Sequence, residues 1–259
     1  MKTGIIGEGA IGRYVADALA SRGLGPHVIL TRSGPTGTAP GGVTRVRSAD
    51  DLPGDLTLMI DCAGHAALAQ HGPAILSRGI DLVTVSLGAL ADPALETALT
   101  EAARRGRAQL HLASGAIGAL DALRAARVGG LTEVTYTGRK PPKGWKGSPA
   151  EDRLDLDMLE TAATHFEGTA RDAATTYPKN ANVAAAVALA GAGFEATQVR
   201  LIADPAVTAN IHEIHATGAF GQFHFRIEGH ALPDNPRSSA LAAMSAVAAI
   251  ERHIAPVTT

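Results

Sequence analysis

The sequence predicts an α/β protein with an N-terminal Rossmann dinucleotide-binding domain and a second α/β domain built on a mixed or antiparallel sheet. Three observations predict it. A glycine turn at residues 7–12 follows an apolar run at the start of the chain. Apolar runs and helical patterns then alternate up to residue 113, as in a parallel sheet with right-handed crossovers. Beyond that point, several runs alternate apolar and polar residues with a period of two, which is typical of strands with one covered face.

The first element is a strand, a glycine turn and a helix at residues 4–20. The turn reads Gly7-Glu8-Gly9-Ala10-Ile11-Gly12. In this pattern one glycine makes the tight turn, one lets a pyrophosphate approach the backbone, and one lets helix and strand pack closely. The helix N-terminus offers N–H groups and a partial positive charge to the phosphates. We therefore predict that a dinucleotide binds at Gly7, Gly9, Ala10, Ile11 and Gly12; a merely structural turn is the alternative.

A second strand is predicted at residues 27–30, and its end bears on the choice of dinucleotide. NAD sites usually place Asp or Glu there to hold the adenine ribose. Here the residues are Thr31, Arg32 and Ser33, and no acid follows before Asp50. Arg32 is placed to meet a 2′-phosphate, so we expect NADP or NAD as cofactor, with NADP accepted at least as well. A solvated arginine at a strand end is the alternative.

The remaining elements complete two domains, at residues 1–113 and 114–237. In the first, residues 34–44 read as a loop, followed by strands at 56–62, 81–86 and 108–112 and helices at 66–78 and 94–105. In the second, a small-residue turn at 114–118 leads into a helix, followed by strands at 131–137, 198–203, 209–216 and 222–228 and helices at 156–165, 169–177 and 182–190. A final alanine-rich helix at 238–253 is expected to pack back on the first domain.

Composition excludes several classes of protein. The net charge of -2 over 259 residues favours neither a nucleic-acid nor an anionic-membrane partner. Cys62 is the single cysteine, which excludes an intramolecular disulfide and a cysteine-cluster metal site, and we expect it to be a small buried residue. Because we find neither a leader segment nor an apolar stretch of about 18 residues, we expect a cytoplasmic protein without a membrane span.

Among ten histidines, His212 stands out. It lies three residues before His215 on a predicted strand, so the two face opposite sides and do not share a metal site. We expect no metal at this protein's site. His212 shares its face with Asn210, and a histidine titrating near neutrality suits proton transfer. A hydrogen-bonded core histidine is the alternative.

Several motifs, in order, carry a resemblance to a known family. They are residues 86–90 (SLGAL), 114–123 (SGAIGALDAL), 138–142 (GRKPP), 177–184 (YPKNANVA), 203–205 (ADP), 210–213 (NIHE), 218–221 (GAFG) and 235–239 (NPRSS). With them the chain resembles the L-aspartate dehydrogenase family nearly from end to end. The resemblance implies a Rossmann domain and a catalytic α/β domain, as a homodimer. It also implies reversible oxidation of L-aspartate to iminoaspartate with NAD or NADP, giving oxaloacetate and ammonia or feeding NAD synthesis.

The resemblance also assigns residues. The active-site histidine of the family falls on His212, and two nucleotide-contacting positions fall on Ala116 and Asn182. Oxidation of an amine takes hydride from Cα and a proton from nitrogen, and hydrolysis of the imine needs an activated water, so one histidine serves both steps. A second domain of about 120 residues is too small to cover both faces of its sheet, so we expect a homodimer through that sheet.

The two carboxylates of the substrate call for cations and amide donors. Candidates are Arg139, Lys140, Lys179 and Asn210, with Arg237 weaker. Arg139 leads because arginine grips a carboxylate with two hydrogen bonds. The alternative interpretation of each cation is a solvated charge on the surface. The alternative interpretation of the motif around Asn180 is that this residue caps the next helix. Two rival functions stay open: a dihydrodipicolinate-reductase-like enzyme acting on another imine or oxo diacid, and a non-catalytic protein that senses NADP.

Overall fold

The computed structural model describes residues 1–38, 42–178, 180–232 and 235–258, with the backbone alone for residues 235–237. The chain divides into two compact units. The first consists of Met1–Ala113 together with Ala242–Thr259, and the second is Ser114–Leu241. The C-terminal segment of the chain therefore belongs to the same unit as the N-terminal sheet.

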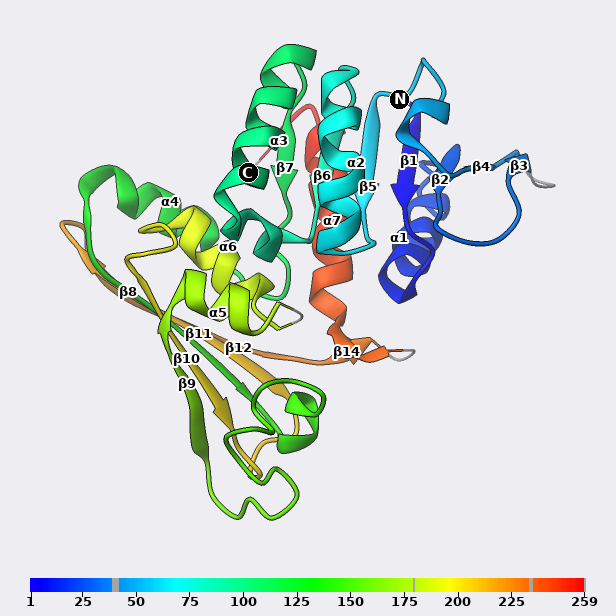
Figure 1. The fold of residues 1–259 in the computed structure, drawn as a ribbon. Helices are drawn as coiled ribbons and strands as arrows, with labels where there is room; N and C mark the ends of the chain where they lie inside the picture. Colours follow the sequence, from blue (N-terminus) through cyan, green and yellow to red (C-terminus); the bar gives the residue numbers. More distant parts are fainter. Residues whose placement is uncertain (39–41, 179, 233–234, 259) are drawn as a thin grey trace. The chain divides into compact units, whose positions relative to one another are not determined.

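The first unit is built on a seven-stranded sheet (Figure 1). Its strands are β1 (Thr3–Ile6), β2 (Val28–Leu30), β3 (Gly37–Thr38), β4 (Thr44–Val46), β5 (Leu58–Asp61), β6 (Asp81–Thr84) and β7 (Leu110–Leu112). Their order is β3-β4-β2-β1-β5-β6-β7, and every neighbouring pair is parallel except β3 and β4. The predicted Rossmann-like sheet is thus confirmed. The loop predicted at 34–44 is wrong in part, because Gly37 and Thr38 pair with Arg45 and Thr44 as a short hairpin.

Helices cover both faces of this sheet. They are α1 (Ala10–Ala20), α2 (His65–Ser77), α3 (Pro93–Gly106) and α7 (Ala240–Ile254), with short 3-10 helices η1 (Ala49–Asp51) and η2 (Leu87–Ala91). Figure 1 shows α2 and α3 on one face and α1 and α7 on the other. Val247 and Ile250 of α7 share one core with Ile5, Val15 and Val83. Burying each such side chain contributes roughly 1.5–3 kcal/mol, so α7 is held to the sheet by its apolar face.

The second unit is built on a five-stranded mixed sheet (Figure 1). Its strands are β8 (Leu131–Lys140), β9 (Ala163–Thr169), β10 (Thr197–Ala203), β11 (Asn210–Gly218) and β12 (Gly221–Gly229), in the order β12-β11-β8-β10-β9. Only β8 and β10 are parallel among these neighbours. A two-stranded sheet of β13 (Ala231–Leu232) and β14 (Asn235–Ser239) precedes α7. The mixed sheet expected from the period-two runs is confirmed.

Helices α4 (Leu120–Gly129), α5 (Ala170–Thr176) and α6 (Asn182–Ala190) pack on one face of this sheet (Figure 1). A 3-10 helix, η3 (Pro142–Trp145), follows β8. The helix predicted at 156–165 is wrong: the segment before Ala163 is irregular and β9 begins there. Asp155 Oδ1 accepts the backbone N–H groups of Asp157 and Met158 at 3.1 and 3.2 Å. Such local bonds offer the backbone an alternative to helix.

The other face of the five-stranded sheet is polar. Glu213 of β11 lies opposite Arg226 of β12, and the two form an ion pair at 3.4 Å. Arg226 also pairs with Glu228 at 2.5 Å.

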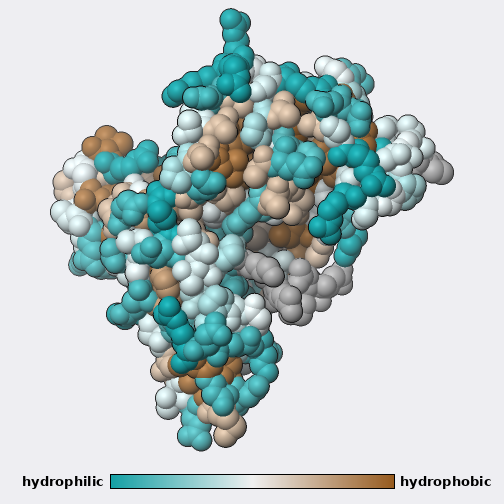
Figure 2. Space-filling model, viewed as in Figure 1, coloured by the Kyte–Doolittle hydropathy of each residue, from teal (hydrophilic) through white to brown (hydrophobic). Residues whose placement is uncertain are grey.

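On the side of the molecule that Figure 2 shows, apolar residues appear as separate spots among polar ones. None of the helices in the described part of the chain is long and apolar enough to cross a membrane.

Candidate functional site

The glycine turn after β1 has the geometry of a dinucleotide cradle. Gly7 has a φ of +93°, and a Cβ there would lie 2.8 Å from Cβ of Ala63. A Cβ on Gly12 would lie 2.2 Å from the carbonyl oxygen of Gly7, so helix and strand pack too closely for any side chain. A Cβ on Gly9 would meet nothing within 4 Å. Two glycines therefore serve packing, and the third leaves open space in front of the helix N-terminus.

The N-terminus of α1 presents its backbone N–H groups to that space. Gly9 is the N-cap, and the described residues supply neither a side-chain cap nor an acid in the first turn of the helix. The unpaired N–H groups and the positive end of the helix dipole favour a bound anion. The predicted residues Ala10 and Ile11 contribute two of these N–H groups. This cradle fits the pyrophosphate of a dinucleotide.

The acid inside the turn, Glu8, is neutralised by Arg45. Arg45 lies on β4, beside Ile29 of β2, and both its Nη2 and its Nε donate to Glu8 Oε1, at 2.8 and 3.1 Å. The Arg45 guanidinium holds the pKa of Glu8 below its ordinary value. Arg45 is not among the site residues predicted from the sequence. An acid inside a phosphate-binding turn was the available signal, because such a charge needs a partner.

The segment after β2 keeps its shape through backbone contacts of Arg47. Arg47 Nη1 donates to the carbonyl of Arg32 at 3.1 Å, and Nη2 donates to that of Gly34 at 2.5 Å. Thr31 is buried and donates to the carbonyl of Ser33 at 2.9 Å. The side chain of Arg32 is exposed. Arg47 therefore fixes the backbone around Arg32, whose contact with a 2′-phosphate stays a prediction.

A buried carboxyl, Asp61, shapes the neighbouring turn. It accepts hydrogen bonds from Thr84 Oγ1 at 2.8 Å, Ser86 Oγ at 2.6 Å and the backbone N–H of Ala63 at 3.0 Å. Burial raises its pKa above the ordinary value, and the three hydrogen bonds oppose that rise. Asp61 ends β5 beside Ile6 of β1, so it fixes the turn against which Gly7 packs.

In the second unit, His212 forms a buried pair with Tyr136. The Tyr136 hydroxyl lies 2.8 Å from His212 Nδ1, and both residues are less than 5% exposed, at 1% and 4%. Burial and the nearby Lys140 ammonium lower the pKa of His212 to about 3. Burial also raises the pKa of Tyr136. At neutral pH the pair therefore consists of a neutral imidazole and a protonated phenol.

Gly138 makes this pair possible. It lies opposite His212 on the neighbouring strand, and Tyr136 is two residues earlier on the same face of β8. A Cβ on Gly138 would lie 2.7 Å from the Tyr136 hydroxyl oxygen. Only a residue without a side chain leaves room for the phenol to lean along β8 toward His212.

Lys140 lies on the same face of β8 and borders a cavity of about 540 Å³. Its Nζ donates to Asn180 Oδ1 at 3.1 Å and lies 4.7 Å from the centre of the Trp145 ring. Burial lowers its pKa to about 8. The cavity is also lined by Lys143, Lys146 and the predicted Asn210. The lysines at 143 and 146 are not among the predicted site residues, although lysines recur at a spacing of three in this turn rich in proline and glycine.

A second buried histidine–tyrosine pair stands near Lys140. His165 Nδ1 lies 3.0 Å from the Tyr177 hydroxyl, and the His165 ring packs edge-on against Trp145 at 4.3 Å between ring centres. Burial and the cations Arg153 and Lys140 lower the pKa of His165 to about 4. Lys140 thus acts electrostatically on both histidines. His165 is not among the residues predicted from the sequence, because it falls at the end of a predicted helix.

Arg139 does not share the face of Lys140. Its Nη1 donates to Asp204 Oδ2 at 2.6 Å, and it does not line the cavity. Consecutive residues of a strand point to opposite faces, so the side chains of Arg139 and Lys140 lie on opposite faces of the sheet. Of the other predicted residues, Ala116 is buried ahead of α4 and Asn182 begins α6. Lys179 and the side chain of Arg237 lie outside the described residues.

Comparison with known proteins gives consistent matches. Residues 121–253 match the family described as aspartate dehydrogenase, C-terminal, and residues 7–113 match the NAD-binding domain of homoserine dehydrogenase. An L-aspartate dehydrogenase of Ruegeria pomeroyi is 53% identical over 259 residues, covering 99% of this chain and 94% of the relative. One of Cupriavidus necator is 48% identical over 258 residues, covering 95% of each chain.

The fold has a solved counterpart. The crystal structure of aspartate dehydrogenase from Thermotoga maritima superposes with a TM-score of 0.78 and 27% sequence identity. The match covers 100% of this chain and 99% of that one. The predicted combination of a Rossmann domain and a second α/β domain is confirmed by this correspondence.

Proposed function

Because this chain belongs to the L-aspartate dehydrogenase family, we propose that it oxidises L-aspartate to iminoaspartate with NADP or NAD. Water then converts the imine to oxaloacetate and ammonia. The observation that carries the proposal is the buried His212–Tyr136 pair on the strand face that also holds Lys140 and the lysine-lined cavity. This arrangement offers a proton acceptor and cations for two carboxylates.

The cavity suits a small dicarboxylate. Three ammonium groups, of Lys140, Lys143 and Lys146, border it together with the amides of Asn180 and Asn210. Lysine binds carboxylates as a point charge, and amide N–H groups add directional hydrogen bonds. Lys146 already pairs with Asp157 at 2.5 Å, so Lys140 and Lys143 are the better candidates for substrate. This proposal replaces Arg139 by Lys140 as the leading carboxylate ligand.

His212 acts in this proposal as the proton acceptor. For Nε2 to accept a proton, Nδ1 must carry a hydrogen and donate it to the Tyr136 oxygen. That hydrogen bond is made in both the neutral and the charged form of the imidazole. A bound dicarboxylate brings negative charge near His212 and raises its pKa from about 3 toward neutrality. The substrate thereby makes its own base more effective.

The reaction then balances in two stages. The residues of the glycine turn would hold the dinucleotide, which would supply the acceptor for the hydride of the substrate Cα. The amine nitrogen gives up one proton to His212, and its electron pair completes the C=N bond of iminoaspartate. In the second stage His212 returns this proton to the imine nitrogen and accepts one from the water that adds to the imine carbon. It then gives that proton to the nitrogen, and the hydroxyl proton leaves as the C=O bond forms and the C–N bond breaks to release ammonia. Lys140 holds a carboxylate in both stages.

The cavity by itself also fits other dicarboxylates, so a reductase acting on another imine or oxo diacid is the second candidate. A spectrophotometric assay separates the two. Oxaloacetate and ammonia together should consume NADPH, and L-aspartate should reduce NADP. If only another oxo or imino diacid were turned over, the second candidate would stand. Dinucleotide binding without turnover of any acceptor would instead support a sensor of NADP.

The assembly and the location of the protein are also proposals. We expect a homodimer that uses the polar face of the five-stranded sheet, since helices of the described chain cover its other face. The ion-pair network of Glu213, Arg226 and Glu228 on that face favours a polar interface. The cytoplasmic location expected from the sequence likewise stays a prediction.

A further inference from the structure

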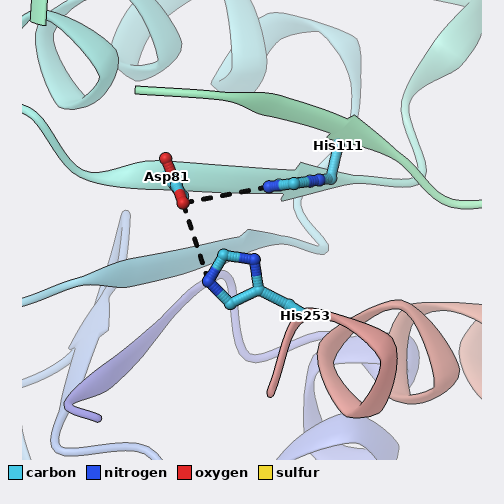
Figure 3. A group of neighbouring side chains, drawn as sticks. All are labelled: Asp81, His111 and His253. Atoms are coloured by element: carbon cyan, nitrogen blue, oxygen red, sulfur yellow. Dashed lines mark ion pairs between the residues drawn. The ribbon is translucent and has the colours of Figure 1, made fainter. Parts of the chain in front are cut away.

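Three side chains that are far apart in the sequence converge in the first unit (Figure 3). Asp81 is the first residue of β6, His111 lies in β7, and His253 lies in the last turn of α7. One ligand atom from each lies within 4.8 Å of the other two. The proposed dehydrogenase reaction uses none of these residues.

The fold brings them together for clear reasons. Val83 and His111 are register partners on the parallel strands β6 and β7, and Asp81 lies on the same face of β6 as Val83. Helix α7 covers that face, since its Ile250 shares a core with Val83. His253 comes one turn after that contact, so it reaches the start of β6. Burial of the apolar face of α7 thus sets the position of His253.

The atoms are arranged as ligands. Asp81 Oδ2 lies 3.9 Å from His111 Nε2 and 3.6 Å from His253 Nε2, which is too far for hydrogen bonds. Ligands of a tetrahedral ion at about 2.0–2.2 Å are separated by roughly 3.3–3.6 Å, so small side-chain movements close the set. The other oxygen of Asp81 accepts the backbone N–H of Gln109 at 2.7 Å. That bond orients the carboxylate, as outer-shell contacts do in metal sites.

His111 adds an independent sign. Its Nε2 is buried and has no hydrogen-bond partner among the described residues, although Asp81 and His253 both face it. Buried polar atoms are almost always paired. The unpaired Nε2 of His111 therefore points to a bound ion.

We propose that Asp81, His111 and His253 bind a divalent transition metal ion of the zinc class, with water completing the coordination. Two imidazoles and one carboxylate suit Zn²⁺ far better than Mg²⁺, which prefers oxygen ligands. The side chains are 23–28% exposed, so an ion has access from solvent. The site lies at the start of β6, whereas the dinucleotide turn follows the end of the parallel strand β1. Its role is therefore to fasten α7 to the sheet, apart from the proposed chemistry.

Titration of the full-length protein, without an affinity tag, with ZnCl₂ tests this proposal by calorimetry and by thermal unfolding. One Zn²⁺ per chain is expected, with a raised Tm, no comparable effect of MgCl₂, and weaker binding at acidic pH because protons compete for the imidazoles. His253→Ala and Asp81→Asn should each weaken binding at least about tenfold, since losing even an outer-shell partner costs that much. Neither should change turnover.

His224→Ala is the matched control, because His224 lies 3.6 Å from Glu213 in a histidine–carboxylate pair that belongs to no three-ligand group among the described residues. It should bind Zn²⁺ as the unaltered protein does. Absence of saturable binding would overturn the proposal. Binding that His253→Ala and Asp81→Asn leave unchanged would overturn it as well. Because His253 is partly exposed near the chain end, its variant is expected to fold even if His111→Ala does not.

Discussion

The Tyr136 hydroxyl lies 2.8 Å from His212 Nδ1, across two neighbouring strands and over a glycine. In the proposed reaction this contact fixes the orientation of the imidazole and the nitrogen that carries its hydrogen. Tyr136 acts through His212 and is therefore a positioning residue. Substituting Tyr136 alone separates its contribution to kcat from that of His212.

Tyr136→Phe keeps the ring and removes the oxygen that His212 Nδ1–H requires. A buried donor left without a partner costs about 1–3 kcal/mol, which corresponds to a loss of roughly fivefold to 150-fold in kcat. We expect that loss under saturating L-aspartate, with unchanged dinucleotide affinity and a shifted pH dependence of kcat. An unchanged kcat with reduced thermal stability alone would show that the contact is only structural.

Gly138→Ala tests the same contact from the other side. The added methyl would lie 2.7 Å from the Tyr136 oxygen and would displace the phenol from His212. We expect kcat to fall as it does in Tyr136→Phe. Gly129→Ala on α4 is the matched control, because its added methyl would meet nothing closer than 3.8 Å. If both alanine variants behaved alike, Gly138 would have no special role.

The lowered pKa of Lys140 predicts that binding of a dicarboxylate depends on pH. Its pKa of about 8 means that the ammonium group is charged below that pH and neutral above it. Affinity for succinate, a dicarboxylate that cannot be oxidised at an amine, should therefore fall as pH rises through about 8. Lys140→Gln should bind weakly at every pH and lose this dependence, whereas Lys2→Gln should behave as the unaltered protein. A Lys140→Gln variant that kept the dependence would exclude Lys140 as its source.

Arg32 predicts the cofactor preference. A charge-assisted contact contributes about 1.5–3 kcal/mol, which corresponds to roughly tenfold to hundredfold in affinity. Arg32→Ala should weaken NADP by that factor and leave NAD nearly unchanged, as measured by fluorescence titration of the reduced dinucleotides. Arg104→Ala, on the exposed side of α3, should change neither. Equal losses for both dinucleotides would show that Arg32 does not contact the 2′-phosphate.

The homodimer is tested by light scattering at micromolar concentration. The proposal expects twice the chain mass of 26.4 kDa. Because the expected interface carries ion pairs, the dimer should weaken at high salt. A single-chain mass at every concentration would remove the proposal without affecting the account of the active site.

Much of the fold could be predicted because local pattern and tertiary structure agree. The apolar run before Gly7 and the period-two run of β12 are each compatible with only one type of secondary structure, a strand. The prediction of a helix at 156–165 is wrong because the Asp155 side chain accepts hydrogen bonds from the backbone, which a pattern of apolar residues does not reveal. The hairpin of β3 was not predicted, because a strand of two residues is too short to show a periodic pattern.

The site divides in the same way. The role of His212 stays a prediction from a family motif, whereas the alternation of a strand already separates Arg139 from Lys140. Tyr136 could not be assigned to His212, because the contact depends on the register between β8 and β11 and on the space above Gly138. Arg45 and His165 were also missed, since their partners come from other strands and helices.

The most direct test of the central claim is the steady-state rate of L-aspartate oxidation by His212→Asn, measured by the absorbance of the reduced nicotinamide. Asparagine keeps a similar size and hydrogen bonding but does not transfer the proton. The account predicts a fall in kcat of about 10²–10⁴-fold with dinucleotide affinity retained. His165→Asn and His215→Asn, as controls, should affect stability more than kcat. Activity that survived in His212→Asn, or vanished instead in a folded His165→Asn or His215→Asn, would contradict the assignment.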